Sequence, residues 1–163
     1  MQASVSIGWS WNLLQPDLRF RAAVQVESIG DVAGRIKDKV SKILSNLELN
    51  NNRSQVIQTN KNDLDICNND QIEFFFKKYK PKFIINAAAY TDVNNSEKHQ
   101  ELAYDINSEG PKKLAYFCEI NNCILIHFST DYVFDGKKNQ YYLPKDKTRP
   151  LNKYGYSKMI GEN

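Results

Sequence analysis

Short apolar runs alternate with longer amphipathic segments from residue 54 to the end of the chain. The apolar runs have the length of strands and cover residues 54–59, 83–89 and 123–128. Strands that alternate with helices are typical of βαβ units, in which consecutive strands lie parallel in one sheet. We therefore predict an α/β fold with a parallel sheet.

The segments between these runs have helical period. The first helix is predicted to begin at Asn69 or Asp70, either of which can cap it, and to end before Pro81. Its apolar positions are Ile72, Phe75, Phe76 and Tyr79. A long helix with an interruption at residues 110–111 follows the second run, and a last helix begins near Tyr154.

The first fifty residues show a weaker pattern. Residues 22–29 predict an opening strand. The segment that follows has one apolar face at helical spacing, which predicts a helix and consists of Ile36, Val40, Ile43 and Leu44.

Composition narrows the class of protein. A chain of 163 residues with 41 % hydrophobic and 25 % charged residues fits one globular domain. The net charge of +3 comes from scattered residues, which argues against a nucleic-acid surface. No apolar run approaches the roughly 20 residues that span a bilayer, and no signal peptide is recognisable, so we expect a cytoplasmic protein with no membrane partner. Three cysteines and two histidines, in no metal-binding spacing, predict no metal site.

Residues with hydroxyl groups follow the third apolar run directly. Ser129 and Thr130 stand where the chain leaves the sheet, which is the place where open α/β sheets carry ligand chemistry. Tyr154 and Lys158 are four positions apart and share one face of the last helix. A nearby ammonium stabilises a phenolate and lowers the tyrosine pKa from about 10. A hydroxyl that polarises a carbonyl, a tyrosine that gives the proton and a lysine that tunes the tyrosine are the parts of a carbonyl-reducing site.

Each of these residues also has a simpler interpretation. A Tyr-x-x-x-Lys pair is common on helix surfaces, and Ser129 and Thr130 can merely cap a strand end. His127 alternates within its strand, which favours a hydrogen-bonded core or edge histidine over a general base. Asn86 and Asn107 are expected to be structural.

Four blocks of the sequence carry a more specific pattern. They are INAAAYTDV (85–93), AYDINSEGPKKLA (103–115), LIHFSTDYVFDGKK (125–138) and PLNKYGYSKMIGE (150–162). In this order they closely resemble the dTDP-4-dehydrorhamnose reductase family of the extended short-chain dehydrogenase/reductase superfamily. The resemblance runs from about Asp63 to Glu162. It implies a Rossmann-like domain with a doubly wound parallel sheet. Such a domain binds NADPH or NADH and reduces the 4-keto group of dTDP-4-dehydro-L-rhamnose to give dTDP-L-rhamnose.

The resemblance also implies which residues act. It places the catalytic hydroxyl, tyrosine and lysine at Thr130, Tyr154 and Lys158. Hydride from the nicotinamide would reach C4 of the sugar while Tyr154 donates a proton, and Lys158 would also bind the nicotinamide ribose. The implied cofactor contacts are Asp65, Ile66, Ala89, Tyr90, Thr91, Phe128, Tyr154 and Lys158.

The end of the second strand bears on the choice of cofactor. Rossmann proteins that select NAD hold an acid there for the ribose diol. This chain has Thr59, Asn60 and Lys61 instead. Because Lys61 can meet a 2′-phosphate, we predict NADPH rather than NADH.

Two features depart from the family pattern. The family has GxxGxxG in the turn that approaches the pyrophosphate, whereas the corresponding region here has only Gly30 and Gly34, which predicts weak cofactor binding. The chain ends soon after Lys158, which predicts a truncated or degraded copy without the substrate domain and with an open sheet edge that favours self-association. We accordingly predict a divergent extension at 1–21 and a partial NAD(P)-binding domain at 22–163.

Two other functions remain compatible with the sequence. A nucleotide-sugar epimerase or dehydratase of the same superfamily shares the Tyr-x-x-x-Lys pair. A non-catalytic relative, such as the regulatory β subunit of methionine adenosyltransferase, keeps the fold and acts by binding.

Overall fold

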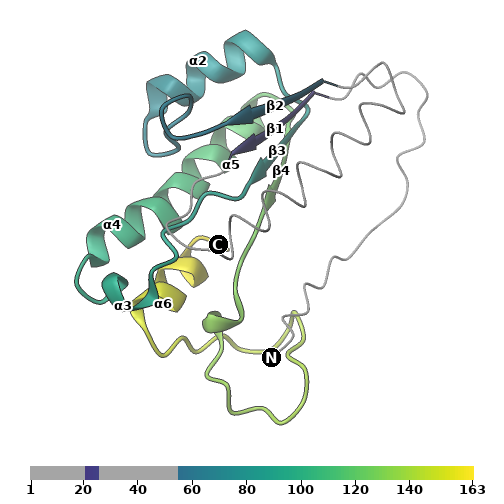
Figure 1. Ribbon diagram of the computed structural model, residues 1–163. Helices are drawn as coiled ribbons and strands as arrows, with labels where there is room; N and C mark the ends of the chain where they lie inside the picture. Colours follow the sequence, from purple (N-terminus) through teal and green to yellow (C-terminus); the bar gives the residue numbers. More distant parts are fainter. Residues whose placement is uncertain (1–20, 26–54) are drawn as a thin grey trace.

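Among the residues that the structure describes, four parallel strands form one sheet in the order β2-β1-β3-β4 (Figure 1). The computed structural model describes residues 21–25 and 55–163, with side chains from residue 56 onward. The strands are β1 (Arg21–Gln25), β2 (Gln55–Thr59), β3 (Phe83–Asn86) and β4 (Ile124–His127). The chain moves outward from β1 to β2 and then crosses to the other side of β1, so the strand order reverses between β1 and β3. The predicted Rossmann-like parallel sheet is confirmed.

The first described helix, α2 (Asn69–Tyr79), fills the segment predicted for it. Its cap is Asn68, not Asn69 or Asp70 as predicted, because the Asn68 side chain accepts two backbone N–H groups of the first turn. Lys80 adopts a left-handed conformation with φ of 45° and ends the helix. The predicted helix around Ile36 and the turn with Gly30 and Gly34 lie outside the described residues.

The predicted long helix is divided into pieces. They are α3 (Val93–Ser96), α4 (Gln100–Tyr104), a π-helical turn η1 (Asp105–Glu109) and α5 (Gly110–Ile120). The predicted interruption therefore lies in η1, just before Pro111. Proline has no N–H to donate to the carbonyl four residues earlier, that of Asn107, which explains why regular α-helical bonding fails there.

The main core lies between one face of the sheet and the helices α2 and α5, which cover the same side (Figure 1). Its buried residues are Leu64, Ile66, Ile72, Phe75, Phe76, Ile84, Ala88, Leu114 and Cys118. Ile124 and Ile126 of β4, one of the two outer strands of the described sheet, keep 48 % and 42 % of their surface exposed. A short 3₁₀ turn, η2 (Asp131–Val133), and the last helix, α6 (Lys153–Ile160), complete the described elements. Within the described ranges, no helix has the length and apolar character needed to cross a membrane.

Replacing Leu114 by alanine should lower the free energy of unfolding by about 2–5 kcal/mol, because this side chain is fully buried in the core. Leu151→Ala is the matched control, since Leu151 is 74 % exposed and its truncation should cost less than about 0.5 kcal/mol. Urea unfolding measures both changes. Similar losses in the two variants would contradict this description of the core.

Candidate active site

The carboxyl ends of the four strands form one row. Thr59 lies beside Gln25, Gln25 beside Asn86, and Asn86 beside His127. Open α/β sheets bind ligands beyond this edge, at the point where the strand order reverses. The segments that leave β2, β3 and β4 at this row carry every predicted site residue except Tyr154 and Lys158, which lie on α6.

The segment after β2 is well anchored. A side-chain oxygen of Asp65 accepts the N–H of Cys67 at 2.8 Å, which fixes a tight turn. The Ile66 side chain is only 3 % exposed and packs against Gly110 in the core. Ile66 is therefore part of the core.

The segment after β3 is held by one buried amide. Asn107, in η1, accepts the N–H of Tyr90 at 2.8 Å and donates to the carbonyl of Tyr90 at 3.0 Å. Tyr90 is buried, while Ala89 and Thr91 on either side of it are half-buried. The predicted cofactor segment 89–91 is thus fixed in place by its central residue.

The same amide also holds α6. Asn107 Nδ2 lies 2.9 Å from Ser157 Oγ, to which it donates, and the Ser108 hydroxyl donates to the Ser157 carbonyl at 2.7 Å. Asn107 has no exposed surface, so these bonds have no competition from solvent. The loop after β3 and the helix with Tyr154 and Lys158 are consequently joined through one residue.

Two glycines let α6 approach its neighbours closely. A Cβ atom at Gly155 would lie 2.2 Å from the carbonyl oxygen of Tyr132, and one at Gly161 would lie 2.1 Å from that of Asn107. The first turn of α6 is also capped from elsewhere in the chain, because Glu97 Oε1 accepts the N–H of Lys153 at 2.8 Å. The helix is therefore positioned by backbone contacts at both ends.

This position brings Tyr154 beside the segment after β4. The Tyr154 side chain is 9 % exposed, and its ring meets that of Tyr132 edge-on at 5.6 Å. Burial raises the pKa of Tyr154, and hydrogen bonding with the Thr130 side chain opposes this rise without cancelling it. Thr130 and Tyr154 are thus brought together as predicted, but the expected lowering of the tyrosine pKa is not found.

The direction of the Lys158 side chain explains why the Tyr154 pKa is not lowered. Its side chain is 2 % exposed, and Nζ donates to the Phe128 carbonyl at 2.6 Å and lies 3.2 Å from His127 Nε2. The amine thus faces the end of β4. Burial lowers the pKa of Lys158 to about 8, an effect that the charge of Glu162 only partly offsets.

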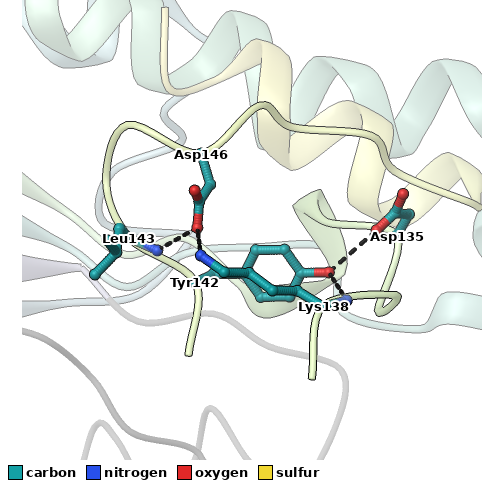
Figure 2. Close-up of polar contacts among 5 residues, drawn as sticks. All are labelled: Asp135, Lys138, Tyr142, Leu143 and Asp146. Atoms are coloured by element: carbon teal, nitrogen blue, oxygen red, sulfur yellow. Dashed lines mark hydrogen bonds and ion pairs between the residues drawn. The ribbon is translucent and has the colours of Figure 1, made fainter. Parts of the chain in front are cut away.

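Side-chain contacts hold together the loop that joins η2 to α6 (Figure 2). The Tyr142 hydroxyl donates to Asp135 at 3.1 Å and accepts the N–H of Lys138 at 3.3 Å. Lys138 Nζ in turn reaches Asp146 at 2.5 Å, and the same carboxylate accepts the N–H of Leu143. These contacts make the connection between Thr130 and Tyr154 a structured element.

The described part of the chain contains no cluster of three His, Cys, Asp or Glu side chains arranged to hold a metal ion. The sequence predicted a structural role for Asn107 but did not show which segments this residue connects. It also missed Glu97 and Ser157 altogether. The available signal was the small residues Gly155, Ser157 and Gly161 on one helix, which indicate close packing.

Lys158→Met should stabilise the protein at neutral pH by about 1–3 kcal/mol, because a buried ammonium is replaced by an apolar side chain of similar length. The lysine pKa is lowered in the fold from 10.5 to about 8, so the cost of the charge is fully present below pH 8 and disappears as the pH rises toward 10.5. Urea unfolding across this range should show the advantage of the variant shrinking with pH. Lys153→Met, at an exposed position of the same helix, is the control. If the stability gained in Lys158→Met does not change with pH, the buried charge of Lys158 is not its cause.

Comparisons with known proteins agree with this architecture. A dTDP-4-dehydrorhamnose reductase of Aggregatibacter actinomycetemcomitans is 40 % identical over 124 residues, which cover 76 % of this chain and 42 % of that protein. The solved structure of a dTDP-4-dehydrorhamnose reductase from Clostridium acetobutylicum has a TM-score of 0.74 at 35 % identity and matches 88 % of this chain and 48 % of its own. A UDP-glucose 4-epimerase from Thermus thermophilus reaches 0.67 at only 15 % identity, a likeness of fold alone.

A second solved reductase carries a cofactor. The dTDP-4-dehydrorhamnose reductase of Bacillus anthracis, in complex with NADP, has a TM-score of 0.75 at 29 % identity over 89 % of this chain and 48 % of that one. This chain spans less than half the length of each of these three reductases. The family model described as "RmlD substrate binding domain" matches residues 39–163. Because this match includes well over half of the chain, the protein belongs to the RmlD family, that of the dTDP-4-dehydrorhamnose reductases.

Proposed function

We propose that this chain provides the cofactor-binding and catalytic part of an NADPH-dependent reductase that converts dTDP-4-dehydro-L-rhamnose to dTDP-L-rhamnose. The observation that carries the proposal is the pairing of Thr130 and Tyr154 beside the carboxyl edge of the sheet, with Lys158 one turn further along α6. The relatives named for this reaction support the substrate class.

The residues at this edge fit a dinucleotide. The loops after β2, β3 and β4 all leave the row of strand ends next to the reversal of strand order, where such cofactors bind. Lys61 is exposed just beyond β2, at the end where a 2′-phosphate would distinguish NADPH from NADH. Asp65, Ala89, Thr91 and Phe128 are proposed to line the rest of the site, together with the backbone of Ile66 and Tyr90.

The chain's own side chains supply the proton chemistry. NADPH, when bound, supplies the hydride that reduces the C4 carbonyl of the sugar. The Thr130 hydroxyl is suited to hydrogen-bond the carbonyl oxygen, and Tyr154 to protonate the alkoxide that forms there. The Tyr154 phenol is protonated at neutral pH and so has a proton to donate, although burial, which raises its pKa, makes it a weaker acid than a phenol in water.

Sequence similarity favours this reaction over the alternative enzymes. The reductases are 29–40 % identical to the chain, whereas the UDP-glucose 4-epimerase of Thermus thermophilus is 15 % identical. A non-catalytic relative that acts by binding is separated from the reductase by the assay below.

The test is oxidation of NADPH in the presence of dTDP-4-dehydro-L-rhamnose by this chain joined to the remaining part of a family reductase, because the chain spans less than half the length of those enzymes. Tyr154→Phe keeps the ring and removes the proton donor, so the rate should fall roughly 10²- to 10⁴-fold. Thr130→Val should cost less, because it removes one hydrogen bond and leaves the acid. The rate with NADH should be lower than with NADPH.

Outcomes of this assay separate the possibilities. Equal rates for Tyr154→Phe and the unchanged protein would show that Tyr154 is not the acid. Binding of NADPH, measured by calorimetry, without any turnover would favour the binding relative. Weak binding is expected from the turn with two glycines, so the complete absence of NADPH binding at high cofactor concentration would contradict the proposal as a whole.

A further inference from the structure

A line of polar side chains crosses from β3 through β4 to α6. Asn86 and His127 are neighbours across the two strands, and Asn86 Nδ2 lies 3.1 Å from His127 Nδ1. The other ring nitrogen, Nε2, lies 3.2 Å from Lys158 Nζ. The imidazole thus bridges a buried amide and the proposed catalytic lysine.

The first contact has a defined direction. The N–H of Ala88 donates to Asn86 Oδ1 at 3.0 Å, and only the oxygen of the amide can accept it. The NH₂ group of Asn86 therefore faces His127, and Nδ1 of the ring must accept. A neutral imidazole that accepts at Nδ1 carries its proton on Nε2.

The ring remains neutral across the ordinary pH range. Its burial and the positive charge of Lys158 lower the pKa of His127 to about 3, and a hydrogen bond with the Asn86 backbone opposes this decrease without cancelling it. Among the described residues, the charged or titratable groups that act on the histidine and lysine pair are these two side chains and Glu162, which follows α6. Glu162 already accepts the Ser129 hydroxyl.

The second contact then selects a form of the lysine. An ammonium has three donors and no acceptor, so it cannot satisfy a ring N–H that points at it. A neutral amine can accept that N–H with its lone pair and still donate to the Phe128 carbonyl at 2.6 Å. All the hydrogen bonds around Lys158 are satisfied only in the amine form.

We propose that His127, oriented by Asn86, is a positioning residue that directs its Nε2–H at Lys158 and favours the neutral amine over the ammonium. Such a lysine can give and take a proton near neutrality, whereas an ordinary lysine stays charged. Its use in restoring the proton of Tyr154 after each turnover rests on the proposed function. The hydrogen-bond arrangement itself does not.

Nitrogen NMR of the protein with ¹⁵N-labelled histidine tests the arrangement directly. The chain has two histidines, and His99 is exposed, so His99→Gln leaves only the signals of His127. We expect a neutral ring with its proton on Nε2 that does not titrate between about pH 5 and 9. A proton on Nδ1, or a titration near 6.5, would overturn the proposal, and neither result depends on substituting His127.

The lysine gives a second measurement. In protein labelled with ¹³C-lysine, the Lys158 signal is the one that disappears in Lys158→Met, and it should titrate near pH 8. His127→Gln removes the N–H that faces the amine, so the Lys158 pKa should rise by about one pH unit or more, while His99→Gln leaves it unchanged. An unchanged or lower lysine pKa in His127→Gln would contradict the proposal. Because these experiments need neither NADPH nor sugar, their failure would leave the proposed reductase activity intact, and failure of the reductase assay would leave them valid.

Discussion

The docking of α6 on η1 is the contact on which the candidate site depends. Two of the residues proposed for proton chemistry, Tyr154 and Lys158, lie on α6. This helix is eight residues long and too short to be stable alone. Its position is set by Asn107, which binds Ser157 with the same amide group that binds both backbone groups of Tyr90. The absent N–H of Pro111 leaves the Asn107 carbonyl outside regular helical bonding, and Gly161 packs directly against this carbonyl. A local irregularity of one helix therefore fixes the geometry of another.

Two buried side chains of the candidate site reduce the stability of the fold. Lys158 is buried with a carbonyl and a neutral histidine as its hydrogen-bond partners, although buried charges are usually paired with an opposite charge. Tyr154 is buried with its pKa raised. Both groups are perturbed mainly by loss of solvent, and such perturbations are common where side chains have chemical work to do. Among the described residues, Lys158 is the only charged residue that is buried, and the core between the sheet and α2 and α5 contains none.

Most of the strands and helices could be predicted from the sequence. Apolar runs and helical spacing are set by the order of apolar and polar residues within one short segment, which can be seen without knowing the fold. The choice of Asn68 over Asn69 and Asp70 as the cap could not be predicted, because three neighbouring residues can all do this. Helical spacing is sufficient for the run Phe74–Phe76. Successive residues on a helix point about 100° apart, so Phe75 and Phe76, which the spacing assigns to the apolar face, are buried while Phe74 is 63 % exposed. For the candidate site, the sequence predicted that Thr130 and Tyr154 lie together, and the structure brings these two residues together. The direction of the Lys158 side chain and the bond from Glu97 to α6 depend on contacts between distant segments, which spacing does not reveal.

Hydrogen exchange of the α6 amides in Asn107→Ala tests the central claim most directly. Removing the amide leaves the backbone groups of Tyr90 and the Ser157 hydroxyl without their partner, at a cost of roughly 1–3 kcal/mol. Exchange at the amides of residues 157–160 should then accelerate about 10- to 100-fold, and clearly more than exchange in β3 and β4. Asn94→Ala, at an exposed position, should change neither region. If α6 keeps its protection in Asn107→Ala, or loses no more than the sheet does, Asn107 is not what holds the helix in place.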